Sequence, residues 1–253
     1  MHKTKGFTLI ELLVVIAIVA LLISILVPLL TRAREHVKIA ICRKNVKTLA
    51  VAWLTYIDDN DGLLVSADVG KYKEDEWAHS TTSTSPEETI KAITTGKLFP
   101  YIKIAGSYHC PSDNRYKRPN GNLPGDGEYR SYSIVRGMNG WDEEPNETLK
   151  RYNEIKRPAD LYVFIEERYK RPPSQGAWHI ETENKWSSNL ALWHNNRTIL
   201  GFADSHVELH KWEDKRTIAY HKSPTPTDAD SLQVNNTDLK YMWEHYPRHA
   251  QED

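Results

Sequence analysis

The side chains of this sequence that are suited to proton transfer are chiefly His194, Asp204, Glu166 and Glu167. Groups of these types act as a general acid or base when the fold brings them to a substrate. No local motif connects them, because the sequence has no nucleophile elbow, no phosphate-binding glycine loop and no H-E-x-x-H motif. We therefore predict that the chain is not an enzyme, and we expect His194 and Asp204 to hydrogen-bond and fix a turn.

A second group of side chains is of the type that binds metals. His206, Glu208 and His210 alternate along one predicted strand, so they share one of its faces. Histidine and glutamate are zinc ligands, but three such residues on an exposed strand are also an ordinary solvated face. Both interpretations stay open for this strand.

Acidic residues gather at two further places. A calcium loop that started at Asp58 would need a glutamate at its twelfth position, where the sequence has Val69. The run from Asp58 to Asp61 is therefore predicted to be a polar helix end and turn. Asp228 and Asp230 are a second, weak calcium candidate. No cofactor is predicted.

The composition excludes several classes of protein. The 253 residues include 33 Lys and Arg against 34 Asp and Glu, a net charge of -1, so no large basic field is available for nucleic acid. Two cysteines exclude a disulfide-rich scaffold and permit one bridge at most. The length fits one globular domain with an appendage.

That appendage is an apolar stretch from Phe7 to Leu30, whose only charge is Glu11. As a helix it would span roughly 36 Å at about 1.5 Å per residue, enough to cross a bilayer core of about 30 Å. A secretory signal has a shorter apolar core, of about 7 to 15 residues, and a small-x-small cleavage site after it. This stretch has neither feature.

An ionised Glu11 inside a bilayer would cost about 2.5 to 3.5 kcal/mol. If the chain were cut between Gly6 and Phe7, the new amino group would be a partner for Glu11 of a neighbouring copy. The alternative is that Glu11 lies close enough to the interface to reach water and has no role.

The residues around this carboxylate carry a resemblance to a known family. Lys5–Ala17 reads KGFTLIELLVVIA. This run resembles the signal of type IV prepilins and type II secretion pseudopilins. The resemblance implies cleavage after Gly6 by an inner-membrane prepilin peptidase, N-methylation of Phe7, and a role for Glu11 in aligning subunits within a fibre. Other pilin or pseudopilin subunits are then expected partners.

We divide the chain into a leader at 1–6, a transmembrane assembly helix at 7–30, an amphipathic continuation at 31–60 and a head at 61–253. Apolar residues in the continuation recur at helical spacing, namely Val46, Leu49, Ala50, Trp53, Leu54 and Ile57. Gly62 can end the helix in the left-handed conformation.

The head is expected to contain antiparallel strands joined by polar loops, among them Thr81–Pro86 and Lys117–Gly127. The strand candidates are Tyr132–Val135, Leu161–Ile165, Thr198–Ala203 and Val207–Leu209. An N-terminal helix followed by strands indicates the α+β class. The resemblance implies a pilin-like version, with the helix packed on an antiparallel sheet.

The hairpin at 194–210 carries a second resemblance. His194 and Asp204 have nine residues between them, which resembles the H-x9-DG motif of prepilin-like proteins, although Ser205 replaces the glycine. Cys42–Gly62 and Cys110–Asp113 are similar to further stretches of the same family.

Cys42 lies on the exported part of the predicted helix and Cys110 on a head loop. In an oxidising compartment a bridge between them would close a long loop and stabilise the head by about 4 kcal/mol on the entropic model. Two buried free thiols are the alternative.

The tryptophans also permit two interpretations. An exposed group of aromatic rings can bind sugars, whereas buried rings supply the core, since each can bury about 150 to 250 Å². The residues concerned are Trp77, Trp141, Trp178, Trp186, Trp193 and Trp212.

Together these features predict a structural pseudopilin-like subunit of a type II secretion pseudopilus or type IV pilus-like fibre. It would be a single-pass protein of the bacterial inner membrane with an extracytoplasmic head. The alternative is a membrane-anchored binding or hydrolytic domain that uses the prepilin signal only for export.

Overall fold

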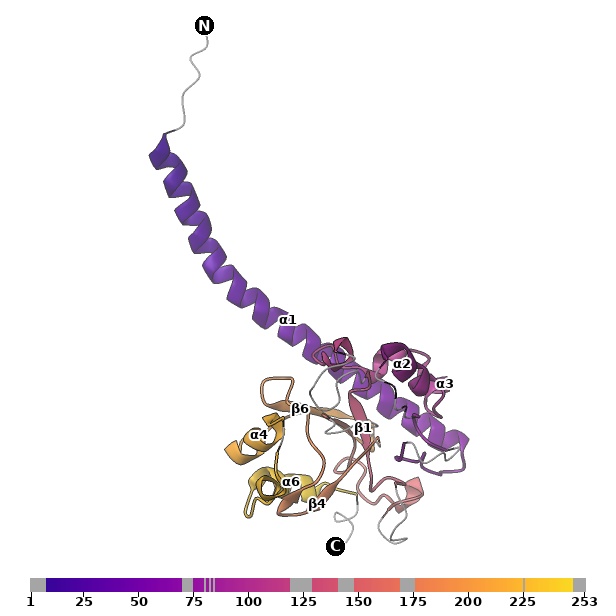
Figure 1. Cartoon of the computed structure of the whole chain (residues 1–253). Helices are drawn as coiled ribbons and strands as arrows, with labels where there is room; N and C mark the ends of the chain where they lie inside the picture. Colours follow the sequence, from indigo (N-terminus) through magenta and orange to yellow (C-terminus); the bar gives the residue numbers. More distant parts are fainter. Residues whose placement is uncertain are drawn as a thin grey trace. The chain divides into compact units, whose positions relative to one another are not determined.

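The computed structural model describes residues 8–69, 75–79, 81, 83, 85–118, 129–140, 148–168, 176–224 and 226–247. The chain divides into two compact units, Met1–Ala40 and Ile41–Asp253. Helix α1, Leu9–Asp59, has 51 residues and belongs to both units (Figure 1). Pro28 lacks a backbone N–H to donate, yet the helix continues through it without a break.

The second part of α1 is amphipathic, as its sequence predicts. Of the six apolar residues at helical spacing, all except the partly buried Leu54 are buried. The helix ends where Asp61 and Gly62 adopt φ of 53° and 78°, and the Gly62 N–H donates to the Ile57 carbonyl at 3.0 Å. The predicted polar helix end is therefore confirmed.

A glycine lets α1 lie close to the sheet. A Cβ added to Gly201 would come within 2.6 Å of Cγ1 of Val46 and 3.4 Å of Cβ of Phe164. This position has no room for a larger residue, because the helix side chain already fills the space.

The main sheet has five strands in the order β3-β1-β2-β6-β7. Their bounds are β1 Tyr132–Val135, β2 Tyr162–Glu166, β3 Ala177–Trp178, β6 Arg197–Phe202 and β7 Val207–Lys211. β1, β2, β6 and β7 pair in antiparallel fashion, as predicted, and β6 and β7 form the expected hairpin. β3 instead pairs with β1 in parallel. A strand of two residues, such as β3, is too short to show the alternating pattern by which a sequence predicts a strand.

Short helices lie in segments for which the sequence predicts no helix, whereas most of the expected loop Lys117–Gly127 and parts of Thr81–Pro86 lie outside the described residues. The helices are α2 Pro86–Thr94, α3 Phe99–Ile102, α4 Lys215–Lys222, α5 Asp228–Ser231 and α6 Thr237–Glu244, with 3-10 turns η1 Ala105–Tyr108, η2 Arg115–Lys117 and η3 Tyr152–Glu154. A small second sheet pairs β4 Ile180–Thr182 with β5 Lys185–Trp186. In Figure 1, α4 and α6 lie on the other side of the main sheet from the second part of α1.

Tryptophans supply much of the core. Trp53, Trp77, Trp178, Trp186 and Trp212 are buried and Trp193 is partly buried, whereas Trp141 lies outside the described residues. The core interpretation therefore holds for the rings that bury their area, and these are not available as a sugar platform.

Candidate functional site

The first turn of α1 contains the carboxylate singled out by the sequence. Oε2 of Glu11 accepts hydrogen bonds from the Thr8 backbone N–H at 2.8 Å and the Thr8 hydroxyl at 2.7 Å. The Glu11 N–H donates in return to the Thr8 hydroxyl at 3.3 Å. This reciprocal arrangement is a capping box, in which Thr8 precedes the helix and Glu11 is its third residue. Gly6 and Phe7 lie outside the described residues.

The turns that follow carry large apolar side chains that the described residues leave exposed. Leu9, Leu13, Ile16, Leu22 and Leu26 are each more than half exposed. By length and composition α1 can cross a membrane. An exposed apolar surface of this size needs lipid or other protein chains to cover it.

A buried cluster of four ionisable residues lies in the head. Sγ of Cys42, on α1, is 2.7 Å from Sγ of Cys110, and both residues are free cysteines. Nε2 of His194 is 3.4 Å from Sγ of Cys110 and 3.1 Å from Oε1 of Glu166, on β2. All four side chains are buried, and their ligand-type atoms lie within 4.8 Å of one another.

The cluster changes the acidity of its members. Burial raises the pKa of the Cys110 thiol well above its usual value, and the neighbouring Cys42 and Glu166 act in the same direction. Burial alone would lower the pKa of His194, but hydrogen bonding to Cys110 and Glu166 outweighs it and raises that pKa to about 10. The structure therefore favours a neutral thiol beside a protonated imidazole.

The loop that presents Cys110 is held by a second buried network. The Asp113 carboxylate accepts hydrogen bonds from Arg115, among them Nε to Oδ1 at 3.0 Å and Nη2 to Oδ2 at 2.7 Å, and from the Ser131 hydroxyl at 2.7 Å. The same hydroxyl accepts from the Cys110 N–H at 3.0 Å. The Ser131 hydroxyl thus links the backbone of Cys110 to the carboxylate of Asp113, which gives a structural reason for the short spacing of these two residues.

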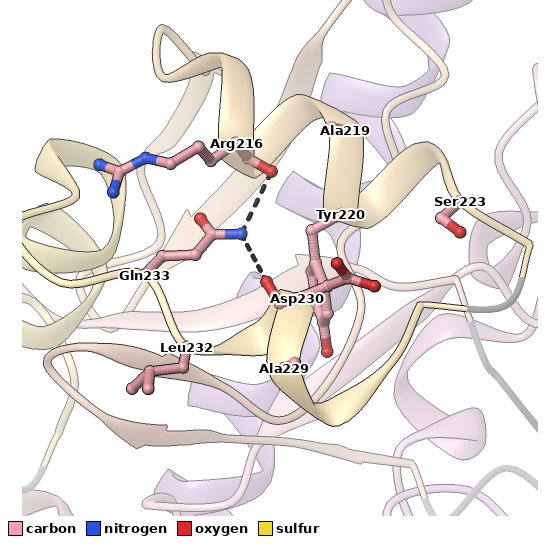
Figure 2. Close-up of a pocket in the computed structure, with 8 residues that line it drawn as sticks. All are labelled: Arg216, Ala219, Tyr220, Ser223, Ala229, Asp230, Leu232 and Gln233. Atoms are coloured by element: carbon pink, nitrogen blue, oxygen red, sulfur yellow. Dashed lines mark hydrogen bonds between the residues drawn. The ribbon is translucent and has the colours of Figure 1, made fainter.

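The described residues also line a surface hollow of about 430 Å³ between α4 and α5 (Figure 2). Its polar groups bond to the protein itself: Nε2 of Gln233 donates to the carbonyls of Arg216 and Asp230 at 3.2 and 2.9 Å. The Arg216 guanidinium pairs with Asp214 at 2.7 Å. Burial, with nearby carboxylates, raises the pKa of Tyr220 to about 12, so its phenol stays neutral. We assign no ligand to this hollow.

Comparison with known proteins decides the nature of the N-terminus. The family described as the prokaryotic N-terminal methylation motif matches residues 1–27. The chain carries a prepilin-type signal. The match supports a type IV pilin-like or pseudopilin-like protein, and the signal implies processing by a prepilin peptidase and pilin-like assembly. Neither a curated protein nor a solved structure matches the chain.

The α+β fold, a long N-terminal helix followed by a head with an antiparallel sheet, is as predicted and is consistent with a pilin-like fold. The H-x9-DG resemblance stays a prediction. Its proposed hydrogen bond is wrong: His194 contacts Glu166 and Cys110, whereas Oδ1 of Asp204 accepts from the backbone N–H of His206 at 2.9 Å and contacts its Nδ1 at 2.6 Å. Each of the two motif residues bonds to a partner that the spacing of the motif does not predict.

Ser205 stands where that motif has glycine, and the structure shows why glycine would suit the turn. Its φ is 73°, a conformation that L-residues adopt at a cost. Its hydroxyl and carbonyl both bind Nζ of Lys47 at 2.8 Å, which ties the hairpin to α1. The serine thus adds a contact that glycine could not make in full.

The weak metal candidates do not converge within the described part of the chain. His206 stacks on Phe202 and His210 on Tyr241, each with ring centroids 4.1 Å apart, so the two histidines serve different neighbours. Oε1 of Glu208 lies 3.7 Å from Nε2 of His206, and the Glu208 side chain also hydrogen-bonds to Tyr241. Asp228 pairs with Lys185 at 3.2 Å, and Asp230 forms a capping box with Thr227.

Proposed function

We propose that this protein is a structural pseudopilin-like subunit that assembles through α1 into a type II secretion pseudopilus or a type IV pilus-like fibre. One observation carries the proposal: within the matched signal, the first turn of α1 holds a lone carboxylate, Glu11, and the helix continues from there with an exposed apolar surface. Packing of such helices against one another removes their apolar surface from lipid and water.

Cleavage after Gly6 would leave the amino group of Phe7 four residues before Glu11. In the precursor chain the Glu11 carboxylate bonds to Thr8, which already reduces the cost of placing it near a membrane. During assembly the positive N-terminus of an incoming subunit would pair with this carboxylate and set the axial position of the two helices.

The subunit acts mechanically, and we propose that it has no enzymatic activity. In support, the two side chains best suited to proton transfer, His194 and Glu166, are 1% and 0% exposed, so a substrate would not reach them. The apolar helix would lie in the bacterial inner membrane, with the head on its extracytoplasmic side.

The experiment that tests this function is intact-mass and N-terminal peptide analysis of the protein from its native membrane, beside a Gly6→Ala variant. We expect a mature chain that starts at methylated Phe7, lost in the variant. Chemical cross-linking of wild-type membranes should then give multimers that contain this chain. A chain that starts at Met1, or one cut beyond Leu30, would contradict the proposal and favour an anchored binding or hydrolytic domain.

A further inference from the structure

The buried cluster of Cys42, Cys110, Glu166 and His194 is the strongest chemical feature of the head outside the assembly helix. Two kinds of chemistry suit such a group. A zinc-class cation is bound by thiolates, imidazole and carboxylate, and two thiols can also join as a disulfide. The hydrogen bonds around the cluster distinguish these two outcomes.

The Glu166 carboxylate requires a proton on Nε2 of His194. Oε2 of Glu166 accepts from the Ile199 backbone N–H at 2.9 Å, and Oε1 faces Nε2 of His194 at 3.1 Å. An ionised carboxylate only accepts hydrogen bonds, so Nε2 must donate. A nitrogen that donates has no lone pair for a metal.

Metal binding at Nε2 would therefore require the protonated ring to lose the proton that Glu166 holds, and the proton left on the ring would be on Nδ1. Nδ1 is buried, and among the described residues it has no hydrogen-bond partner. Metal-bound histidines almost always donate their second ring N–H to a carboxylate, a carbonyl or water. Because the surroundings of Nδ1 supply no such acceptor, the site is poorly built for a cation.

The two sulfurs, by contrast, need no rearrangement of this kind. They are in direct contact at 2.7 Å and come from segments far apart in the chain, α1 and the loop after η1. The sequence contains no third cysteine that would compete for either one. Asn45, one turn from Cys42, donates to the His109 carbonyl at 2.9 Å and so holds the same loop against α1.

We propose that Cys42 and Cys110 join in a disulfide once the head has left the cytoplasm, which fastens the assembly helix covalently to the head beneath the His194–Glu166 pair. This inference rests on the proposed function, because an exported head meets oxidising conditions. Each thiol loses its proton, and two electrons pass to an oxidant of the disulfide class, which is reduced to two thiols as the new sulfur–sulfur bond forms.

The bond would give the fibre a mechanical property. A force along the packed helices reaches the head through α1, and its polar contacts there include non-covalent bonds such as the two hydrogen bonds from Lys47 to Ser205. A covalent link at Cys42 keeps the helix attached to the head when these contacts open. Because both sulfurs are buried, the bond must form before α1 is fully docked, while the oxidant can still reach them.

The test uses the full chain in its native membrane. Free thiols are alkylated under denaturing conditions, with and without prior reduction, and the labels are counted by mass. We expect no label without reduction and two labels after it. In a Cys42→Ser control Cys110 should be labelled without reduction, which shows that the reagent reaches that site. Zinc and other metals are measured in the same wild-type preparation.

Two outcomes overturn the disulfide. One is labelling of both thiols without reduction, and the other is one equivalent of zinc with labelling that requires a chelator. Protease accessibility of the head in spheroplasts separates this from failure of the proposed function. An accessible head that starts at Phe7 but holds free thiols overturns the disulfide alone, whereas a protected cytoplasmic head with free thiols overturns both.

Discussion

Glu11 caps the helix that it is expected to align, because its carboxylate accepts both the backbone N–H and the hydroxyl of Thr8 at 2.8 and 2.7 Å. Two roles therefore share one side chain. As a cap it stabilises the first turn of α1. As a charge it would attract the N-terminus of another subunit. Substitutions that differ in only one of these properties separate the roles.

Glu11→Gln keeps an oxygen that can cap Thr8 but removes the charge, whereas Glu11→Val removes both. We expect both variants to be cleaved after Gly6 and both to lose assembly, because the missing property is the charge. Cross-linked multimers, compared with the mass of the mature chain, measure this. If Glu11→Gln assembles like the wild type while Glu11→Val does not, capping is the property that matters.

The close approach of α1 to β6 gives a second prediction. Gly201→Ala places a new Cβ 2.6 Å from Cγ1 of Val46, which is too close for two carbon atoms. Val46 has little freedom to move away. We expect the head to lose about 1 to 3 kcal/mol of unfolding free energy. Urea denaturation, followed by tryptophan fluorescence, measures the change.

Val46→Ala is the matched control for this substitution. By itself it leaves a small cavity, but combined with Gly201→Ala it removes the atom that the new methyl meets. The double variant should therefore be more stable than the sum of the two single effects predicts. Simple additivity would show that α1 does not pack on Gly201 as described.

The hairpin that joins β6 and β7 yields a third prediction. Ser205→Ala keeps the positive φ and loses the hydroxyl contact with Lys47, so we expect a loss of about 0.5 to 1.5 kcal/mol. Ser205→Gly loses the same contact but relieves the backbone, which offsets about 1 kcal/mol. The glycine variant should be the more stable of the two by thermal denaturation, and the opposite order would contradict the left-handed conformation.

How far the sequence predicts this structure depends on the range of each interaction. The signal at Lys5–Ala17 is local, and so are the β-branched and aromatic residues of β1 and β2, and the sequence predicts all of them. Apart from the pairing of Cys42 with Cys110, it does not predict which distant segments meet. Glu166 and His194 were each recognised as acid–base types, yet nothing in their spacing shows that they meet.

The same limit applies to the hairpin motif and to the short elements. Spacing suggested that His194 bonds to Asp204, but a neighbouring strand supplies a better partner in Glu166, while Asp204 bonds to the adjacent His206. β3 is only two residues long, and it forms because β1 offers an unpaired edge. Such elements are determined by tertiary contacts more than by their own residues.

The buried His194–Glu166 pair gives the last prediction, a dependence of stability on pH. The pKa of His194 is about 10 in the folded head, against about 6.5 in an unfolded chain. A raised pKa contributes stability that is fully present below about pH 6.5 and is lost as the pH rises towards 10. Burial raises the pKa of Tyr132, which faces the same cluster, well above its usual value, so that phenol stays neutral in this window. With both cysteines reduced, the state in which Cys110 helps to raise the pKa of His194, we expect this histidine to lower the unfolding free energy of the wild-type head by up to about 1.4 kcal/mol per pH unit across the window. The raised pKa of the buried Cys110 thiol adds to the fall above about pH 8.5 in the wild type and in the variants. Glu166→Gln should flatten this slope, because it removes the charge that holds the proton.

The control is Asp204→Asn, which alters a carboxylate of the same region whose contacts are with His206. The slope of this variant should match the wild type. Equal slopes in the wild type and in Glu166→Gln would show that Glu166 does not hold the His194 proton.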